Sequence, residues 1–254
     1  SGTGMHNCVD AMGATTPPEH DGYTYGGASW SLFAPAQYTF MNKYFLTASM
    51  RAAASYKFGK YYRIGYFPSV SASWLMSNEE FFKQFEYLTF LKLRASYGVT
   101  GNSNINAFQP LATYDLNITY QDQVGAYPER LYNSKLTWES AHMSGLGLDI
   151  SFLDRFHVNL DVYNIENKDL LLLVPKSPST GFFDRMENAG SVRNRGLEVQ
   201  VSTDNIKTKD WLWNTTFNIS FNKNQVRSLA GDESFLQVAG NTSVYQQVKT
   251  GQDI

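Results

Sequence analysis

Apolar and polar residues alternate along much of the chain between residues 29 and 222. The pattern is clearest at residues 69–74, where Val70, Ala72 and Trp74 alternate with three serines. Successive side chains of a strand point to opposite faces, so this period of two predicts β-strands. It recurs at residues 29–40, 46–51, 91–99, 145–152, 156–163, 197–202 and 213–222. We therefore expect about eight antiparallel strands in an all-β fold.

The connections between these strands differ in length. Short turns are predicted at residues 41–43, 154–155 and 205–210, and a connector at 77–85 in which Ser77 and Glu80 favour a capped helical turn. Long connections span residues 53–66, 100–135, 167–188 and 223 onward. Residues 98–104, GVTGNSN, predict a loop and lack the Gly-Lys-Ser/Thr of a phosphate-binding loop. Short turns that alternate with long loops are typical of outer-membrane β-barrels.

The two faces of the predicted strands differ in charge. The apolar faces carry no charged residue, and the opposite faces carry Arg51, Lys92, Arg94, Asp149, Asp161 and Glu198. Aromatic residues lie near the strand ends, as the interfacial girdles of a membrane barrel require. Soluble β-sandwiches also alternate polar and apolar residues. The pattern alone therefore leaves a membrane barrel and a soluble sandwich about equally favoured.

Composition excludes several other classes. The net charge is −2 and Lys and Arg do not cluster, so no nucleic-acid surface is predicted. The longest apolar run, residues 170–174, is too short for a membrane helix. The single cysteine, Cys8, excludes an internal disulfide, and we expect no signal peptide in this sequence, because residues 1–27 lack a basic segment followed by an apolar one.

No chemical site emerges from the motifs. His6 and Cys8 are two potential metal ligands, which is too few for a metal site. Asp149 and Asp161 would form a carboxylate pair for acid–base catalysis if they faced each other across a hairpin, but polar barrel-lining residues are the commoner explanation. We therefore predict no catalytic residue, metal or cofactor.

Six segments, in order along the chain, resemble the barrel signatures of SusC/RagA-like TonB-dependent outer-membrane transporters. They read FPSVSASW, LKLRASYGVTGNSNI, LTWES, YNIENKDLLL, NAGSVRNRGLEV and FNISFNKNQV. The resemblance implies an antiparallel transmembrane β-barrel, of which this sequence holds a part, in the outer membrane of a Gram-negative, Bacteroidota-like bacterium. We expect an extracellular loop at residues 1–27, strands and loops at 28–228, and another extracellular loop at 229–254, with no plug domain.

The resemblance also implies a function. Such transporters import glycan or peptide fragments with a SusD-like surface lipoprotein as a lid, and a TonB complex supplies the force. Here TonB would act through an N-terminal part that this sequence lacks. The plug and the remaining barrel strands would be further partners, with outer-membrane lipid around them. We expect the six charged residues named above to face the lumen.

Aromatic and amide side chains in the predicted loops are candidates for substrate binding, because ring faces stack on sugars and peptides while amides direct hydrogen bonds. These candidates are Tyr61, Tyr62, Asn102, Asn104, Phe108 and Tyr114. The alternative function is a binding module without transport, either a small closed β-barrel or a soluble glycan-binding β-sandwich.

Overall fold

The computed structural model describes residues 28–59, 61–105, 114–120, 123–128, 130–182, 184–229, 235–238 and 246–251. Eight antiparallel strands form one sheet in the order β1-β2-β3-β4-β7-β8-β11-β12. Their bounds are β1 (Ser29–Phe40), β2 (Tyr44–Ser55), β3 (Ile64–Leu75), β4 (Leu88–Asn102), β7 (Glu139–Phe152), β8 (Phe156–Lys168), β11 (Ser191–Lys207) and β12 (Leu212–Ser228). Each strand pairs with its predecessor in this order, as the sequence pattern predicted.

The register of the sheet keeps apolar residues beside apolar residues. One row runs across four strands through Leu146, Val162, Leu197 and Phe221, which are direct partners. Leu146, Val162 and Phe221 are 59%, 52% and 58% exposed, so this face is not covered by the described residues. A slip of one residue would move every side chain of a strand to the other face. The register therefore fixes two chemically distinct surfaces.

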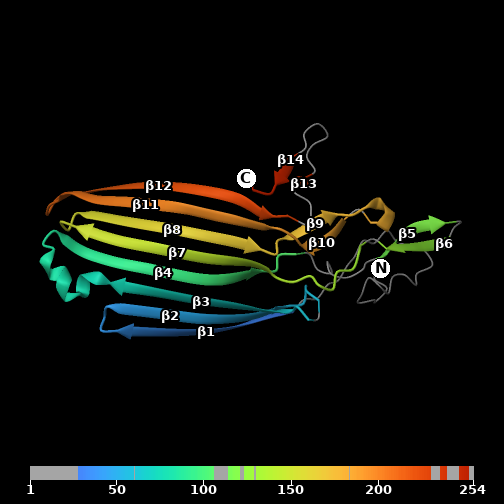
Figure 1. Cartoon of the computed structure of the whole chain (residues 1–254), viewed down its shortest axis with the longest axis horizontal. Coiled ribbons are helices and arrows are strands. Elements are labelled where there is room, and N and C mark those ends of the chain that lie inside the picture. Colours follow the sequence, from blue (N-terminus) through green and yellow to red (C-terminus); the bar gives the residue numbers. More distant parts are fainter. Residues whose placement is uncertain are drawn as a thin grey trace, which may run out of the picture.

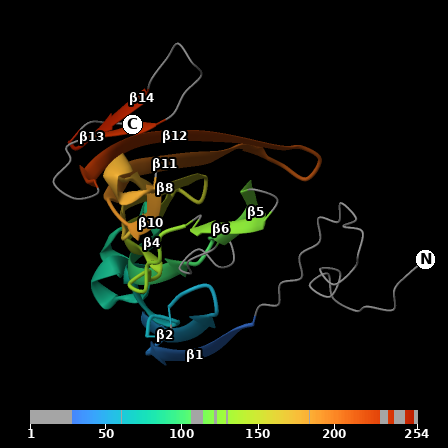
Figure 2. The ribbon, with the colours of Figure 1, turned by 90° about the vertical axis from the view of Figure 1, so that its right-hand side faces the viewer.

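The sheet is an open, curved wall. Figure 2 looks along the strands and shows an arc that ends at β1 on one side and β12 on the other. Among the described strands, β1 and β12 are not paired with each other, and no second sheet packs across the eight strands. The small closed barrel and the soluble sandwich are therefore wrong, whereas the partial barrel of about eight strands is confirmed.

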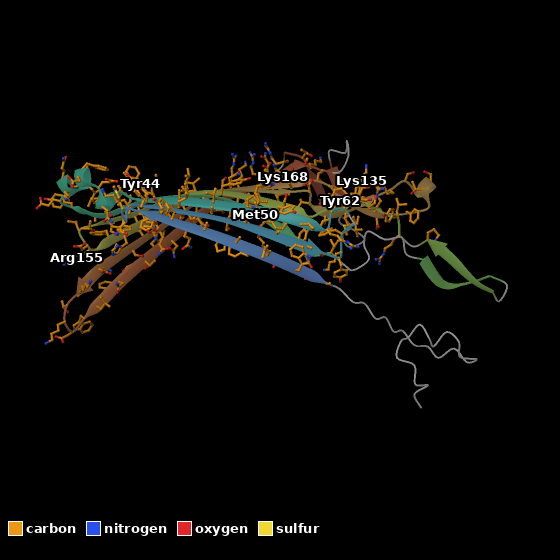
Figure 3. The ribbon with its side chains drawn as sticks, turned by 90° about the horizontal axis from the view of Figure 1, so that it is seen from below. Tyr44, Met50, Tyr62, Lys135, Arg155 and Lys168 are labelled. Carbon is orange, nitrogen blue, oxygen red and sulfur yellow. The ribbon has the colours of Figure 1, made fainter. Side chains whose placement is uncertain are left out.

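The two ends of the sheet differ as predicted. In Figure 1 the short turns gather at one end and the long connections at the other. Figure 3 shows Arg155 at the first end, here called the turn end, and Tyr62, Lys135 and Lys168 toward the second, the loop end. The described helices are three short 3₁₀ turns, and none has the length and hydropathy to cross a bilayer.

The long connections contain strands that the sequence pattern did not reveal. They form three small hairpins: β5 (Tyr114–Tyr120) with β6 (Gln123–Pro128), β9 (Leu171–Pro175) with β10 (Asp184–Asn188), and β13 (Phe235–Val238) with β14 (Gln246–Lys249). One of the three 3₁₀ turns, η4 (Pro178–Thr180), lies between β9 and β10. The β5–β6 and β9–β10 hairpins extend past the loop end of the sheet, and the β13–β14 hairpin lies beside the end of β12 (Figure 1).

The loop predicted at residues 98–104 is wrong over most of its length. β4 continues to Asn102, which pairs with Glu139 of β7. Gly101 fits here because the ring of Phe67 occupies the space that a side chain at this position would need. The glycine therefore marks close packing within a strand and not a turn.

The connector between β3 and β4 consists of two 3₁₀ turns, η2 (Met76–Asn78) and η3 (Glu80–Gln84). The predicted cap by Ser77 and Glu80 is wrong, because Leu75 and Glu79 precede the two turns and neither makes a side-chain cap hydrogen bond. Glu79 instead accepts hydrogen bonds from Lys43 Nζ at 2.9 Å, the Tyr44 hydroxyl at 2.8 Å and Trp74 Nε1 at 3.2 Å. One carboxylate thus joins the β1–β2 turn to the β3–β4 connector.

The hydrogen bond from Lys43, followed by those from Tyr44 and Trp74, lowers the pKa of Glu79 below its ordinary value of 4.5. A lowered folded-state pKa stabilises the folded state above pH 4.5, and this contribution is lost as the pH falls through the lowered value. Replacing Glu79→Gln should therefore speed hydrogen exchange at the turn end at neutral pH. It should also remove the loss of protection that the wild-type protein shows as the pH falls through the lowered pKa of Glu79. Hydrogen exchange of residues 41–44 and 76–85, corrected for intrinsic pH dependence, measures both effects.

Glu80→Gln is the matched control, because Glu80 is exposed and its ion pair with Lys83 spans 3.7 Å. Exchange in Glu79→Gln equal to that in Glu80→Gln at pH 7 would contradict the role of Glu79.

Candidate functional site

On the polar face of the sheet, one arginine bridges two aspartates from neighbouring strands. Arg94 on β4 donates to Asp149 on β7 through Nε and Nη2, both at 2.9 Å. Its Nη2 also reaches Asp161 on β8, at 3.0 and 3.1 Å from the two carboxylate oxygens. Asp149 and Asp161 lie on the same face, but their strand partners are Asn159 and Gly147, so they do not sit directly opposite each other. Arg94, which stays protonated in proteins, binds both carboxylates. This pairing favours the charged form of both aspartates and does not suit an acid–base pair, in which one carboxyl group must carry a proton.

Gly147 makes this arrangement possible. It lies on β7 between Arg94 on β4 and Asp161 on β8, and is the direct partner of both. A Cβ atom on Gly147 would lie 2.5 Å from Asp161 Oδ1 and 2.6 Å from Arg94 Cζ. The arginine therefore crosses a whole strand because that strand lacks a side chain there.

The remaining predicted lumen residues lie on the same polar face. Lys92 is the partner of Asp149 across β4 and β7, and Glu198 is the partner of Asp161 across β8 and β11. Like charges placed opposite each other destabilise a sheet, and Arg94 offsets the Asp161–Glu198 pair. A hollow of about 380 Å³ lies beside this pair, lined also by Asn159, Gln200 and Asn218. The face thus carries hydrogen-bonding groups of both signs.

A second hollow, here called the loop-end cavity, brings together candidates that lie far apart in the sequence. It has a volume of about 420 Å³, and Arg51, Asn102 and Asn104 line it with Lys57 and Trp138. Asn102 Oδ1 accepts a hydrogen bond from the Asn104 backbone at 2.9 Å, and Lys57 Nζ contacts the Ser103 carbonyl at 3.5 Å. The described residues make no hydrogen bond or ion pair with the side chain of Arg51, whose backbone pairs within the sheet. The cavity therefore offers a guanidinium and amide groups to a ligand.

A small apolar cluster supports the cavity from the loops. Phe58, Ile105 and Leu136 are buried against each other, and Trp138 packs on Phe58 with ring centroids 5.0 Å apart. Sequence reasoning missed Phe58 and Leu136, because single apolar residues in long connections show no periodicity. The only signal was the segment LTWES, which was used for the resemblance alone.

Asn188 ties the β9–β10 hairpin to the same region. Its side chain accepts a hydrogen bond from the Thr137 amide and donates one to the Thr137 carbonyl, both at 2.8 Å. The hairpin is thereby fixed beside the cavity wall.

The other predicted contacts are not gathered at this cavity. Tyr61 and Tyr62 lie in the β2–β3 connection, are exposed, and do not line it. Phe108 lies outside the described residues, as do His6 and Cys8, and Tyr114 begins β5, where only the backbone is described. Within the described ranges, no group of three or more His, Cys, Asp or Glu residues could hold a metal ion.

We expect Gly147→Ala to disrupt the Arg94 cluster and destabilise the folded protein by about 1–3 kcal/mol, because hydrogen bonds between charged groups are lost. Gly145→Ala is the matched control, since its Cβ would meet the flexible Ser96 Oγ at 3.2 Å and the Val162 carbonyl oxygen at 3.9 Å, which is an ordinary contact. The temperature at which the folded form unfolds on a gel measures the difference. Equal temperatures for the two variants would contradict the role given to Gly147.

Comparison with known proteins agrees with this geometry. The family model described as TonB dependent receptor-like, beta-barrel matches residues 7–247. TonB-dependent receptor P39 of Formosa agariphila is 39% identical over 206 residues, which cover 81% of this chain and 20% of that protein. TonB-dependent receptor SusC of Bacteroides thetaiotaomicron is 33% identical over 237 residues, covering 88% of this chain and 23% of SusC.

Solved structures give the same picture. The RagAB peptide importer in its closed-closed state superposes with a TM-score of 0.78 and 27% identity, over 88% of this chain and 25% of the chain compared. This sequence therefore spans about a fifth to a quarter of the proteins that it matches. With the match over residues 7–247 and the open eight-stranded wall, the chain belongs to the TonB-dependent receptor β-barrel family, in its SusC/RagA-like group.

Proposed function

We propose that this chain is part of the barrel wall of an outer-membrane importer that takes up oligomeric nutrients with TonB-transmitted force. The observation that carries the proposal is the register, which keeps a charge-free apolar row and a charged row on opposite faces from β4 to β12. A wall between lipid and an aqueous lumen needs these two surfaces. Membership of the TonB-dependent receptor family supports the coupling to TonB.

The apolar face would contact lipid and the polar face would line the lumen. Arg51, Lys92, Arg94, Asp149, Asp161 and Glu198 are then lumen-facing. Unpaired backbone groups in lipid cost several kcal/mol each, so the free edges of β1 and β12 need neighbouring strands. Further barrel strands and a plug of the same transporter would supply them, and the plug would receive the pull of the TonB complex.

The loop end would face the outside of the cell, since outer-membrane barrels carry long loops there and short turns in the periplasm. In a Cys8→Ser background, Tyr61→Cys should react with a membrane-impermeant maleimide on intact cells, and Thr208→Cys only after the outer membrane is opened. Tyr61 is exposed at the loop end, and Thr208 lies in the β11–β12 turn at the turn end. The reverse labelling would overturn the orientation.

Peptide fragments suit the loop-end cavity better than neutral glycans. The guanidinium of Arg51 can bind a carboxylate, and Asn102 and Asn104 can bind peptide groups. The likeness to structures described as the RagAB peptide importer supports the same class. Tyr61, Tyr62, Phe108 and Tyr114 stay proposed as stacking contacts from the loops. A SusD-like lipoprotein is the proposed lid over residues 1–27 and the β9–β10 hairpin.

In the full transporter, Arg51→Gln with Asn104→Ala should lower uptake of a fluorescent peptide mixture by about tenfold, because a charged hydrogen bond and an amide contact are lost. Lys83→Gln is the control, an exposed cation in the turn-end connector. Barrel assembly, measured by migration on unheated gels, should be the same in both. Unchanged peptide uptake with reduced uptake of neutral oligosaccharides would show that glycans are the substrate.

A further inference from the structure

One connection at the turn end is longer than the others and exposes aromatic side chains. The β3–β4 connector occupies residues 76–87 and is longer than the β1–β2, β7–β8 and β11–β12 turns. Phe81 and Phe85 are 46% and 55% exposed, and Tyr87 is exposed as well, whereas Phe82 is buried. Aromatic side chains that gather on an exposed surface commonly mark a contact with a partner or a membrane.

Hydrogen bonds hold the connector against the apolar face of the sheet. Tyr44 and Trp74 are direct strand partners at the turn end of that face, and their rings stack with centroids 6.1 Å apart. The Tyr44 hydroxyl and Trp74 Nε1 both donate to Oε1 of Glu79 in the connector. Asn78 Nδ2 donates to the Asn42 carbonyl of the β1–β2 turn at 2.9 Å. The connector is thus fixed on the side of the sheet that carries the apolar rows.

The path of the chain gives the same placement. In Figure 2 the two 3₁₀ turns of the connector, drawn in teal, lie outside the arc of strands, on its convex side. The outer side of a transmembrane β-barrel faces lipid, with girdles of aromatic residues where the bilayer meets water. Trp and Tyr suit that boundary because each has an apolar ring and a polar tip. Tyr44 and Trp74, whose polar tips bind Glu79, therefore mark the height of this boundary beside the connector.

The charge of the connector does not suit an anionic partner. It carries Glu79, Glu80 and Glu86 and one cation, Lys83, which is 3.7 Å from Glu80. Segments that bind anionic headgroups at a membrane surface are rich in Lys and Arg. Attachment of this connector to a membrane would therefore depend on its aromatic side chains, and neutral phospholipid would suffice.

We propose that the β3–β4 connector is an interfacial anchor, which inserts Phe81 and Phe85 between the phospholipids of the inner leaflet. The two rings lie at the boundary between headgroups and acyl chains. Because Glu79 binds the connector to β2 and β3, the anchor fixes the height of these strands in the bilayer. Phospholipid fits better than a periplasmic protein, because the connector is bound to the face that continues into the bilayer. The inference rests on the proposed lipid contact of the apolar face and on the proposed orientation.

Photocrosslinking in the full transporter tests the anchor. p-Benzoylphenylalanine is placed at Phe81, Phe85, Leu148 or His157, one position at a time, in nanodiscs of phosphatidylethanolamine and phosphatidylcholine. Leu148 on β7 is the positive control on the apolar face, and His157 on β8 is the negative control on the polar face near the turn end. Mass spectrometry should find phospholipid adducts at Phe81 and Phe85 about as often as at Leu148, and about tenfold more often than at His157, since aromatic side chains at the bilayer boundary are surrounded by lipid.

A second measurement tests how the anchor is held. With the photoreactive residue at Phe81, Glu79→Gln should lower the frequency of phospholipid adducts about threefold, because the connector loses hydrogen bonds to a charged acceptor. Glu80→Gln is the matched control and should leave the frequency unchanged, since Glu80 makes only the exposed ion pair with Lys83.

Adducts at Leu148 combined with no excess over His157 at Phe81 and Phe85 would overturn the anchor and leave the proposed function intact. Crosslinks from Phe81 and Phe85 to protein in place of phospholipid, in nanodiscs or in intact cells, would overturn it as well. Equal adduct frequencies in Glu79→Gln and Glu80→Gln would contradict the role of Glu79 in holding the connector. Absence of adducts at Leu148 would contradict the lipid contact of the apolar face, and with it the proposed function.

Discussion

The separation of two surfaces by strand register is the constraint on which the rest of this structure depends. Each strand has one apolar face and one polar face, and a slip of one residue would exchange them along the whole strand. The pairing of Leu146, Val162, Leu197 and Phe221 on one face, with Gly147, Asp161 and Glu198 on the other, keeps all four strands consistent. The exposed apolar face, which would be a liability in water, is then a requirement of the fold.

On the polar face, glycines leave room for side chains of neighbouring strands to cross them, and the charged side chains that cross are paired. Arg94 reaches two carboxylates because Gly147 leaves room across β7, and Tyr163 lies over Gly196 of β11 in a similar way, with its ring 2.6 Å from an ideal Cβ. At the turn end, Glu79 connects the turn of the β1–β2 hairpin to β3 and the β3–β4 connector through its side chain. Side chains that cross strands thus add to the hydrogen bonds of the ladder.

The sequence predicted the strands where one face meets an apolar environment, because alternation is then visible. It failed where both faces are polar: β4 continues through Gly98 and Gly101 to Asn102, and the hairpins of the long connections show no period of two. Arg51 was identified from its strand and Asn104 from its loop, but no sequence signal joins them in one cavity. Likewise, Asp149 and Asp161 were identified as neighbours, whereas the bridging role of Arg94 depends on the missing side chain of Gly147 on the adjacent strand β7.

The central claim is that the apolar face contacts lipid while the polar face contacts water. Spin labels placed one at a time at residues 157–162 of β8, in the full transporter reconstituted in lipid, test it most directly. Oxygen should collide most often with labels at Val158, Leu160 and Val162, and a water-soluble nickel complex with labels at His157, Asn159 and Asp161. Accessibility without a period of two, or with the two sets exchanged, would contradict the account.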